Sequence, residues 1–79
     1  MKSYKVSLES VDKVKNFVQI IGKFNIDIDL RSDRYIIDAK SIMGVFSLDL
    51  SKILNLDVHT DDDVELNKLR DALKDFIVD

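Results

Sequence analysis

The chain has no cysteine, no proline and no tryptophan, and only two of its 79 residues are glycine. Without cysteine, neither a disulfide nor a thiolate zinc site can hold the fold together, so stability must come from packing. The apolar runs are short and are interrupted by Asp, Lys and Asn, and none is long enough to span a membrane. No linker, repeat or low-complexity stretch appears. These absences lead us to expect a small, packed domain that does not cross a membrane.

The residues that are present have the balance of a soluble globular protein, with 46% hydrophobic and 34% charged residues. A length of 79 residues has room for one domain, over residues 1–79, with a small core. The net charge of -3 argues against non-specific binding of nucleic acid. No apolar signal region follows residues 1–5, so we expect a cytoplasmic location.

Alternation of apolar and polar residues predicts strands with one buried face each. The clearest one runs from Phe24 to Leu30, where every second residue is polar. The residues after it, 31–34, are all polar and predict the turn of a hairpin. The four strands are expected over residues 4–8, 24–30, 35–39 and 54–58.

Apolar residues at helical spacing predict a first helix that starts after Ser10, its N-cap, and ends near Gly22. A last helix begins within Asp61-Asp62-Asp63, where Asp62 and Glu65 have the spacing of a capping box. The apolar stripe of the first helix is expected to comprise Val11, Val14, Phe17, Val18, Ile20 and Ile21, and that of the last helix Leu66, Leu69, Ala72, Leu73, Phe76 and Ile77. Largely buried positions are expected at Ile26, Ile28, Leu56, Val58, Leu66, Leu69 and Leu73.

A third, short helix is predicted between the last two strands, so the order of elements is β-α-β-β-α-β-α. Each strand offers one apolar face and each helix offers one stripe. The economical arrangement is an α+β fold in which all helices cover one side of a sheet and water covers the other side.

The short helix belongs to the segment Lys40-Ser41-Ile42-Met43-Gly44-Val45-Phe46-Ser47-Leu48. Ser41 suits an N-cap, because its hydroxyl can accept a hydrogen bond from an unpaired N–H group of the first turn. The segment closely resembles the regulatory serine segment of HPr, the small phosphocarrier of the bacterial sugar phosphotransferase system. The resemblance covers nearly the whole chain and is strongest from Phe17 to Leu48. It implies an HPr-like open-faced β-sandwich, with a four-stranded antiparallel sheet and three helices on one face.

The resemblance also implies a regulatory role for Ser41, which by physical reasoning alone is only a helix cap. In Gram-positive relatives the matching serine is phosphorylated by a dedicated kinase, and the product binds a sugar-responsive repressor. Lys40 lies beside this candidate phosphosite in the sequence, and we count it among the expected partner-binding residues. The implied partners are proteins: a serine kinase or phosphorylase, a transcriptional regulator, or components of the phosphotransferase system. The docking patch of those relatives maps to Ile42, Met43, Val45 and Phe46, of which we expect Ile42 and Met43 to be the more exposed pair.

The junction between the first strand and the first helix departs from the family pattern. In HPr proteins it reads Gly-x-His-x-Arg-Pro, and the histidine accepts the phosphate. Here it reads Leu8-Glu9-Ser10-Val11-Asp12-Lys13-Val14, which has no His, Arg or Pro and is shorter. Glu9 and Asp12 place negative charge where the phosphate would sit, and like charges repel. We therefore interpret Glu9, Ser10 and Asp12 as a degenerate active-site junction, and we do not expect a phosphohistidine relay here.

Neither His59 nor the acidic run predicts a metal or cofactor site. The alternation of the last strand places His59, the single histidine, on the solvent side with no second ligand nearby in the sequence. The run from Asp61 to Asp63 lacks the spaced oxygens, Gly and Glu of an EF-hand loop. Acidic groups at a helix start are explained by the helix dipole.

Three functions remain open from the sequence. The first is a non-catalytic regulatory or protein-binding module of the phosphotransferase system, with control by phosphorylation of Ser41. The second is a phosphocarrier in sugar uptake with a non-standard acceptor, for which His59 is the single imidazole available. The third is an assembly partner that is never phosphorylated. We expect none of them to be an enzyme.

Overall fold

A computed structural model describes residues 1–78, and the elements follow the predicted order. The strands are β1 (Lys2–Val6), β2 (Ile28–Ser32), β3 (Tyr35–Asp38) and β4 (Leu54–Val58). The helices are α1 (Val11–Ile21), α2 (Ile42–Phe46) and α3 (Asp63–Ala72). In the part of the chain that the structure describes, no helix combines the length and apolar character needed to cross a membrane.

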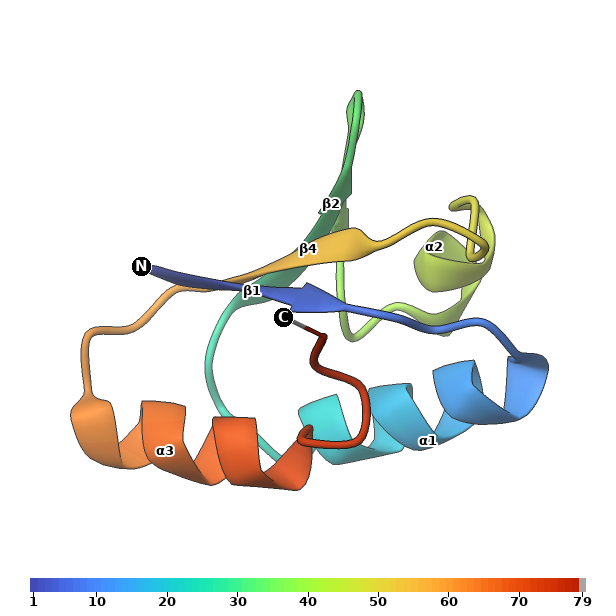
Figure 1. Cartoon of the computed structure of the whole chain (residues 1–79). Coiled ribbons are helices and arrows are strands. Elements are labelled where there is room, and N and C mark those ends of the chain that lie inside the picture. Colours follow the sequence, from blue (N-terminus) through green and yellow to red (C-terminus); the bar gives the residue numbers. More distant parts are fainter. Residues whose placement is uncertain (79) are drawn as a thin grey trace.

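The four strands form one sheet in the order β1-β4-β2-β3, in which all neighbours are antiparallel. Leu56 in the middle of β4 lies opposite Tyr4 of β1 and Leu30 of β2. Helices α1 and α3 lie under one side of the sheet, and α2 packs against α1 and β3 (Figure 1). The other side, which we call the open face, carries none of the helices formed by residues 1–78. The predicted α+β open-faced sandwich is therefore confirmed.

The core lies between the sheet and the helices. Alternate residues of β4 are fully buried, as the period of two predicts. From α1, Phe17 packs its ring edge against Phe76, with ring centroids 5.8 Å apart. The predicted burial is confirmed for Ile28, Leu56, Val58, Leu69 and Leu73, whereas Ile26 and Leu66 are only partly buried at the rim of the core.

Side-chain caps start all three helices, as the sequence predicts for each. The Ser10 hydroxyl accepts a hydrogen bond from the amide of Lys13 (3.1 Å). The carboxylate of Asp62 accepts from the amide of Val64 (2.9 Å) at the start of α3. These bonds satisfy N–H groups that a first helical turn leaves unpaired.

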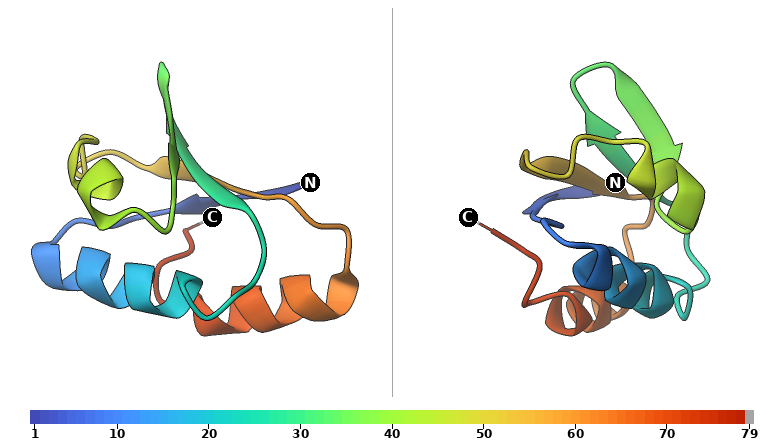
Figure 2. Two further views of the ribbon diagram at one scale, coloured as in Figure 1. Left: turned by 180° about the vertical axis from the view of Figure 1, so that it is seen from behind. Right: turned by 90° about the vertical axis from the view of Figure 1, so that its right-hand side faces the viewer.

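The second strand begins and ends later than predicted. Lys23 and Phe24 donate their amides to carbonyls of the last turn of α1, so the chain is still coiled where the alternation suggested a strand. The strand starts at Ile28 and continues through Ser32, which leaves a turn of only Asp33 and Arg34. The prediction of a strand over 24–30 and a turn over 31–34 is therefore wrong at both ends. The resulting β2–β3 hairpin rises away from α1 and α3 (Figure 2).

The C-terminal segment was also predicted wrongly. Helix α3 ends at Ala72, so Phe76 and Ile77 are not part of its stripe. The chain instead turns back to β1, where Ser7 donates to the carbonyl of Phe76 (2.9 Å) and Val78 donates to that of Lys5 (2.8 Å). Residues 76–78 thereby cover part of the outer edge of β1.

Two smaller expectations are corrected as well. Strand β1 ends at Val6 and not at Leu8, although Leu8 is buried. Val11 is exposed although it was assigned to the apolar stripe of α1, because the first turn of the helix extends beyond the sheet.

Candidate functional site

Ser41 links the edge strand β3 to α2 and has the role of a cap. Its side chain is exposed, and its Oγ accepts a hydrogen bond from the amide of Gly44 (3.2 Å). Asp38 holds the turn that leads to Ser41. The backbone carbonyl of Asp38 accepts a hydrogen bond from the amide of Ser41 (3.0 Å), and its carboxylate accepts one from the amide of Lys40 (2.9 Å). The predicted cap is present, and its hydroxyl can be reached from solvent.

The apolar residues of α2 divide between solvent and core. Met43 is 77% exposed, and Ile42 and Phe46 are 39% and 37% exposed. Val45 is fully buried, so its assignment to a partner-binding patch is corrected. It faces inward because α2 packs against both α1 and β3. A Cβ at Gly44 would make an ordinary contact with the side chain of Ile37 at 3.5 Å but a tight one with Ser41 Oγ at 3.3 Å, so the glycine leaves room for the cap.

The side chain of Lys40 does not lie beside Ser41, although the two residues are neighbours in the sequence. Its Nζ donates to the carbonyl oxygen of Phe24 at 2.7 Å, and the residue is half-buried. The ammonium group therefore holds the loop that follows α1 and is not directed at Ser41. This corrects the expectation that Lys40 contributes to the surface beside the serine.

The junction before α1 has the capping and acidic character that the sequence predicts. Glu9, Ser10 and Asp12 are all exposed. Glu9 accepts a hydrogen bond from the hydroxyl of Ser7 (3.0 Å), and Ser10 occupies the cap. The free N–H groups of the first turn thus face a neutral hydroxyl, with Asp12 in the same turn.

His59 lies at the opposite end of the sheet from this junction. It follows Val58, which pairs with Lys2 at the start of β1, whereas Ser10 follows the end of β1. His59 is exposed at the end of the strand, as expected, and its Nε2 lies 2.9 Å from the Asp29 carboxylate, a partner that the sequence did not indicate. A groove of about 430 Å³ adjoins this pair and is lined by Asp27, Ile28, Asp29, Asp38, Lys40 and His59. Within residues 1–78, no three His or acidic side chains are grouped so as to hold a metal ion.

A polar network on the open face was missed by the sequence reasoning. Asp57 accepts hydrogen bonds from Arg31 Nε (3.0 Å) and from Ser3 Oγ (2.7 Å), and it is only 6% exposed. The hydrogen bond from Arg31 lowers the pKa of Asp57, and the same contact raises the pKa of Arg31. The alternation placed Asp57 on the polar face of its strand, but Arg31 was assigned to the hairpin turn and Ser3 lay before the predicted first strand. The sequence therefore did not indicate that these three residues meet.

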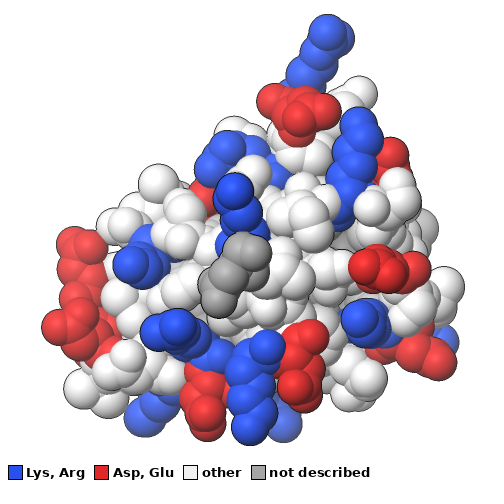
Figure 3. All heavy atoms as spheres, viewed as in Figure 1, with Lys and Arg blue, Asp and Glu red and all other residues white. Residues whose placement is uncertain are grey.

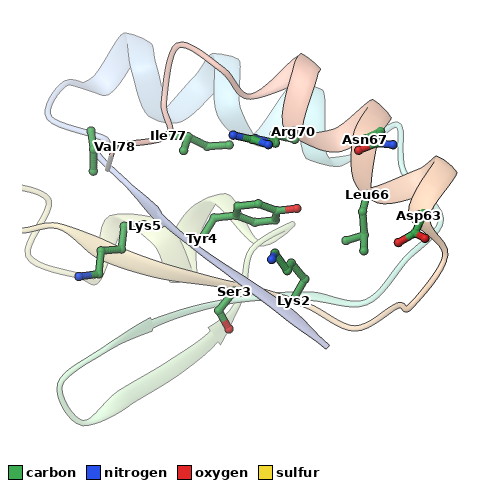
Figure 4. A pocket seen from close by; sticks show the side chains of 10 residues that line it. All are labelled: Lys2, Ser3, Tyr4, Lys5, Asp63, Leu66, Asn67, Arg70, Ile77 and Val78. Atoms are coloured by element: carbon green, nitrogen blue, oxygen red, sulfur yellow. The ribbon is translucent and has the colours of Figure 1, made fainter.

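A second groove, of about 600 Å³, separates β1 from α3. Tyr4 and Leu66 project into it from its two walls, whereas Ser3 and Lys5 point away (Figure 4). Acidic side chains gather at the start of α3, and basic side chains extend across the middle of the same face (Figure 3). The groove shares no lining residue with the Ser41 segment and is lined by Lys2, Ser3, Tyr4, Lys5, Asp63, Leu66, Asn67, Arg70, Ile77 and Val78.

Comparison with known proteins agrees with this geometry. A family model described as "PTS HPr component phosphorylation site" matches residues 12–79. No curated protein matches the chain. The structure of HPr-C-His from Thermoanaerobacter tengcongensis is similar, with 30% identity, a TM-score of 0.74 and coverage of 92% of this chain and 90% of that one.

Two further solved structures support the assignment. The phosphocarrier protein HPr of Bacillus anthracis str. Ames has 28% identity and a TM-score of 0.65, with coverage of 90% of this chain and 92% of that one. A histidine-containing phosphocarrier protein of Mycoplasma has 15% identity and a TM-score of 0.67, covers 94% of this chain and 91% of that one, and supports the fold alone. The chain belongs to the HPr family of the phosphotransferase system, in which HPr itself is a phosphocarrier and not a catalytic enzyme.

Proposed function

We propose that this chain is a regulatory, protein-binding member of the HPr family that does not carry phosphate on a histidine. The observation that carries the proposal is the position of the single histidine. His59 lies at the far end of the sheet from the N-terminus of α1, where the resemblance places the phosphate acceptor. The α1 terminus instead presents Ser10 between Glu9 and Asp12, whose charges disfavour a phosphoryl group. The proposed location of this activity is the cytoplasm.

The proposed docking surface consists of the exposed residues of α2, namely Ile42, Met43 and Phe46, which we call the α2 patch. Their exposure costs free energy in water and is offset when a partner covers them. Methionine suits such a surface, because its unbranched side chain adapts to different partners. Val11, exposed in the first turn of α1, adds to the apolar surface available on the helices.

Ser41 is the proposed point of control. Its hydroxyl is exposed and lies immediately before the α2 patch, so a phosphate there would add negative charge beside the docking residues. A phosphate oxygen can also take over the hydrogen bond from Gly44, so the modification need not unfold the short helix. The partners proposed on this basis are a serine kinase or phosphorylase, a transcriptional regulator, or other components of the phosphotransferase system.

The control by Ser41 is tested with the serine kinase that acts on HPr proteins, ATP and intact mass spectrometry. We expect one phosphate on the wild type and none on Ser41→Ala. Ser47→Ala is the matched control, because Ser47 is an exposed serine of the same segment whose hydroxyl also makes a local hydrogen bond. Transfer to Ser41→Ala, or no transfer to the wild type, would contradict the proposed site.

The α2 patch is tested separately by titration calorimetry, with the sugar-responsive repressor of HPr-regulated genes as the probe. We expect Met43→Lys to weaken the binding of the phosphorylated protein by about tenfold or more, since it introduces a charge into an apolar contact. Val64→Lys is the control, because Val64 is an exposed apolar residue on α3. Equal effects of both variants would show that the α2 patch is not the docking surface.

The alternative of a phosphocarrier with a non-standard acceptor is favoured by one contact. Asp29 holds the Nε2 of His59 at 2.9 Å, and a carboxylate in that position orients an imidazole. If neither Ser41 nor His59 accepts phosphate, the remaining alternative is an assembly partner that acts by docking alone.

A further inference from the structure

The two edge strands of the sheet differ in how far other segments of the chain cover them. The outer edge of β1 is partly covered by residues 76–78, through the bonds to Lys5 and Ser7 described above. Strand β3 forms the other edge, and within residues 1–78 no strand pairs with its outer side. A bare edge strand presents unpaired N–H and C=O groups and can pair with another chain.

The hairpin register shows which backbone groups of β3 are unpaired. Ser32 and Tyr35 flank the two-residue turn, and Ala39 donates its amide to the carbonyl of Ile28 (2.9 Å). Because the groups of an antiparallel strand alternate in direction, Tyr35, Ile37 and Ala39 direct theirs toward β2. The intervening residues Ile36 and Asp38 direct theirs to the outer side. The carbonyl of the turn residue Arg34 also points outward, because it lies on the same peptide as the Tyr35 amide, which faces Ser32.

The side chains of this edge lack the usual protection against pairing. Natural edge strands are commonly blunted by lysine, proline or a bulge. Strand β3 has the sequence Tyr-Ile-Ile-Asp, and Tyr35 and Ile36 are 65% and 66% exposed. The hairpin also rises away from α1 and α3, so these helices do not screen it (Figure 2).

We propose that β3 pairs antiparallel with β3 of a second copy of this chain, about a two-fold axis at Ile36. In this register the two Ile36 residues lie opposite each other, and the N–H group of each donates a hydrogen bond to the C=O group of the other. Arg34 of each copy then lies opposite Asp38 of the other. The symmetry therefore creates two pairs of opposite charge that flank one apolar contact.

Charge and hydrogen bonding select this register over its neighbours. An axis between Ile36 and Ile37 would place outward-facing groups against inward-facing ones and would lose the backbone bonds. An axis at Ile37 would keep backbone bonds but would place Ile36 opposite Asp38. An axis at Tyr35 would place Ile36 opposite Arg34, so neither register forms the two charge pairs. An axis at Asp38 would oppose two aspartates, and an axis at Arg34 would oppose two arginines. In the described part of the chain Arg34 takes part in no ion pair, so its charge is available for a second copy.

One backbone group at the edge is already in use. The carbonyl of Asp38 accepts the amide of Ser41, so Asp38 contributes its N–H group to the pairing, opposite the carbonyl of Arg34. The interface is short, and a weak, concentration-dependent dimer is expected. It would join the sheets of two copies, with one α2 patch on each side, and it does not depend on the phosphorylation of Ser41.

Sedimentation equilibrium over micromolar to millimolar concentrations tests the dimer. We expect a monomer–dimer equilibrium, and an increase of about tenfold or more in the dissociation constant for Ile36→Lys. Ile53→Lys is the control, because Ile53 is an exposed isoleucine outside β3. A protein that stays monomeric throughout, or a dimer that both lysine variants weaken equally, would overturn the proposal.

The register is tested by charge reversal. The substitution Arg34→Asp puts a carboxylate opposite Asp38 of the other copy at both ends of the interface, so it should weaken the dimer. The double variant Arg34→Asp/Asp38→Arg puts opposite charges back in both places and should restore the dimer. Because Asp38 also holds the amide of Lys40, thermal unfolding of each variant must show that the fold persists. Failure of a folded double variant to restore the dimer would contradict the register.

The absence of cysteine allows a direct second test. Ile36→Cys places one thiol in each copy directly opposite the other, at a Cα separation of about 5.5 Å that a disulfide can bridge. Under mild oxidation we expect this variant to form a covalent dimer several-fold faster than the control Ile53→Cys. Equal rates would show random collision and would overturn the proposed pairing.

Discussion

Arg31 Nε donates to Asp57 Oδ2 over 3.0 Å, between strands that are neighbours in the sheet although the two residues are 26 positions apart. The pair lies on the open face, where the hydroxyl of Ser3 donates a further hydrogen bond to the same carboxylate. The side chain of Asp57 is almost completely covered. The contact thus joins β1, β2 and β4 on the open face, where the described part of the chain places no helix.

This network predicts a stability that depends on pH. The pKa of Asp57 is lowered, chiefly by the hydrogen bond from Arg31, so the folded state favours the ionised form. The stabilisation is complete above the unfolded pKa of about 3.9 and is lost as the pH falls through the lower, folded pKa. At pH 7 we expect Asp57→Asn to lower the free energy of unfolding by about 1–3 kcal/mol.

Urea denaturation at a series of pH values checks this prediction. The difference between the wild type and Asp57→Asn should shrink as the pH falls below about 4. Asp33→Asn is the control, since Asp33 is exposed and lies 3.7 Å from Lys52 in a solvated pair. A difference that is constant over the whole pH range would show that the charge of Asp57 has no part in it.

The last helix should depend on Leu69 for its attachment. This residue is fully buried in the core, so Leu69→Ala should cost about 2–5 kcal/mol. Val64→Ala, at an exposed position of the same helix, should change the stability by no more than about 0.5 kcal/mol. An unchanged denaturant midpoint for Leu69→Ala would mean that α3 does not pack on the sheet as described.

The cap of α2 predicts a graded series of variants at Ser41. Ser41→Ala removes the acceptor of the Gly44 amide and should cost about 0.5–2 kcal/mol, whereas Ser41→Asp should be tolerated because Asp also caps well. Thermal unfolding followed by circular dichroism measures both. A Ser41→Asp variant that is less stable than Ser41→Ala would contradict the capping role.

The proposed lack of a phosphohistidine is tested with the first enzyme of the phosphotransferase system and phosphoenolpyruvate. We expect no transfer to the wild type, because the α1 junction has no acceptor imidazole. His59→Asn distinguishes the alternatives. Acid-labile phosphate on the wild type that is absent from His59→Asn would establish the carrier function and reject the regulatory one.

Local sequence signals predicted most of the elements, because they depend on residues that are near one another. The period of two indicated β4, and Ser10, Ser41 and Asp62 marked the starts of the three helices. A side-chain cap acts over two or three residues, so its geometry is contained in the sequence. The element order then limited the fold to a sheet with helices on one side.

Local signals failed where the choice depended on distant packing. Phe76 and Ile77 continue the helical spacing of α3, but the chain leaves the helix to place Phe76 against Phe17 and Ile77 opposite Val6. Val45 has the same apolar character as Met43, and only the contact of α2 with α1 and β3 decides which of them is buried.

For the candidate sites, too, some features follow from the local sequence and others from the packing of distant segments. The sequence by itself determined that the α1 junction lacks an acceptor histidine and that Ser41 can cap a helix. Only the tertiary structure decided that Lys40 turns toward Phe24 and that Asp29 approaches His59. It also decided that residues 76–78 cover part of the edge of β1, whereas no strand within residues 1–78 pairs with the outer side of β3. Backbone hydrogen bonds between strands are the same for nearly every residue type, so a sequence shows which residues can form a strand but not which strand lies beside it.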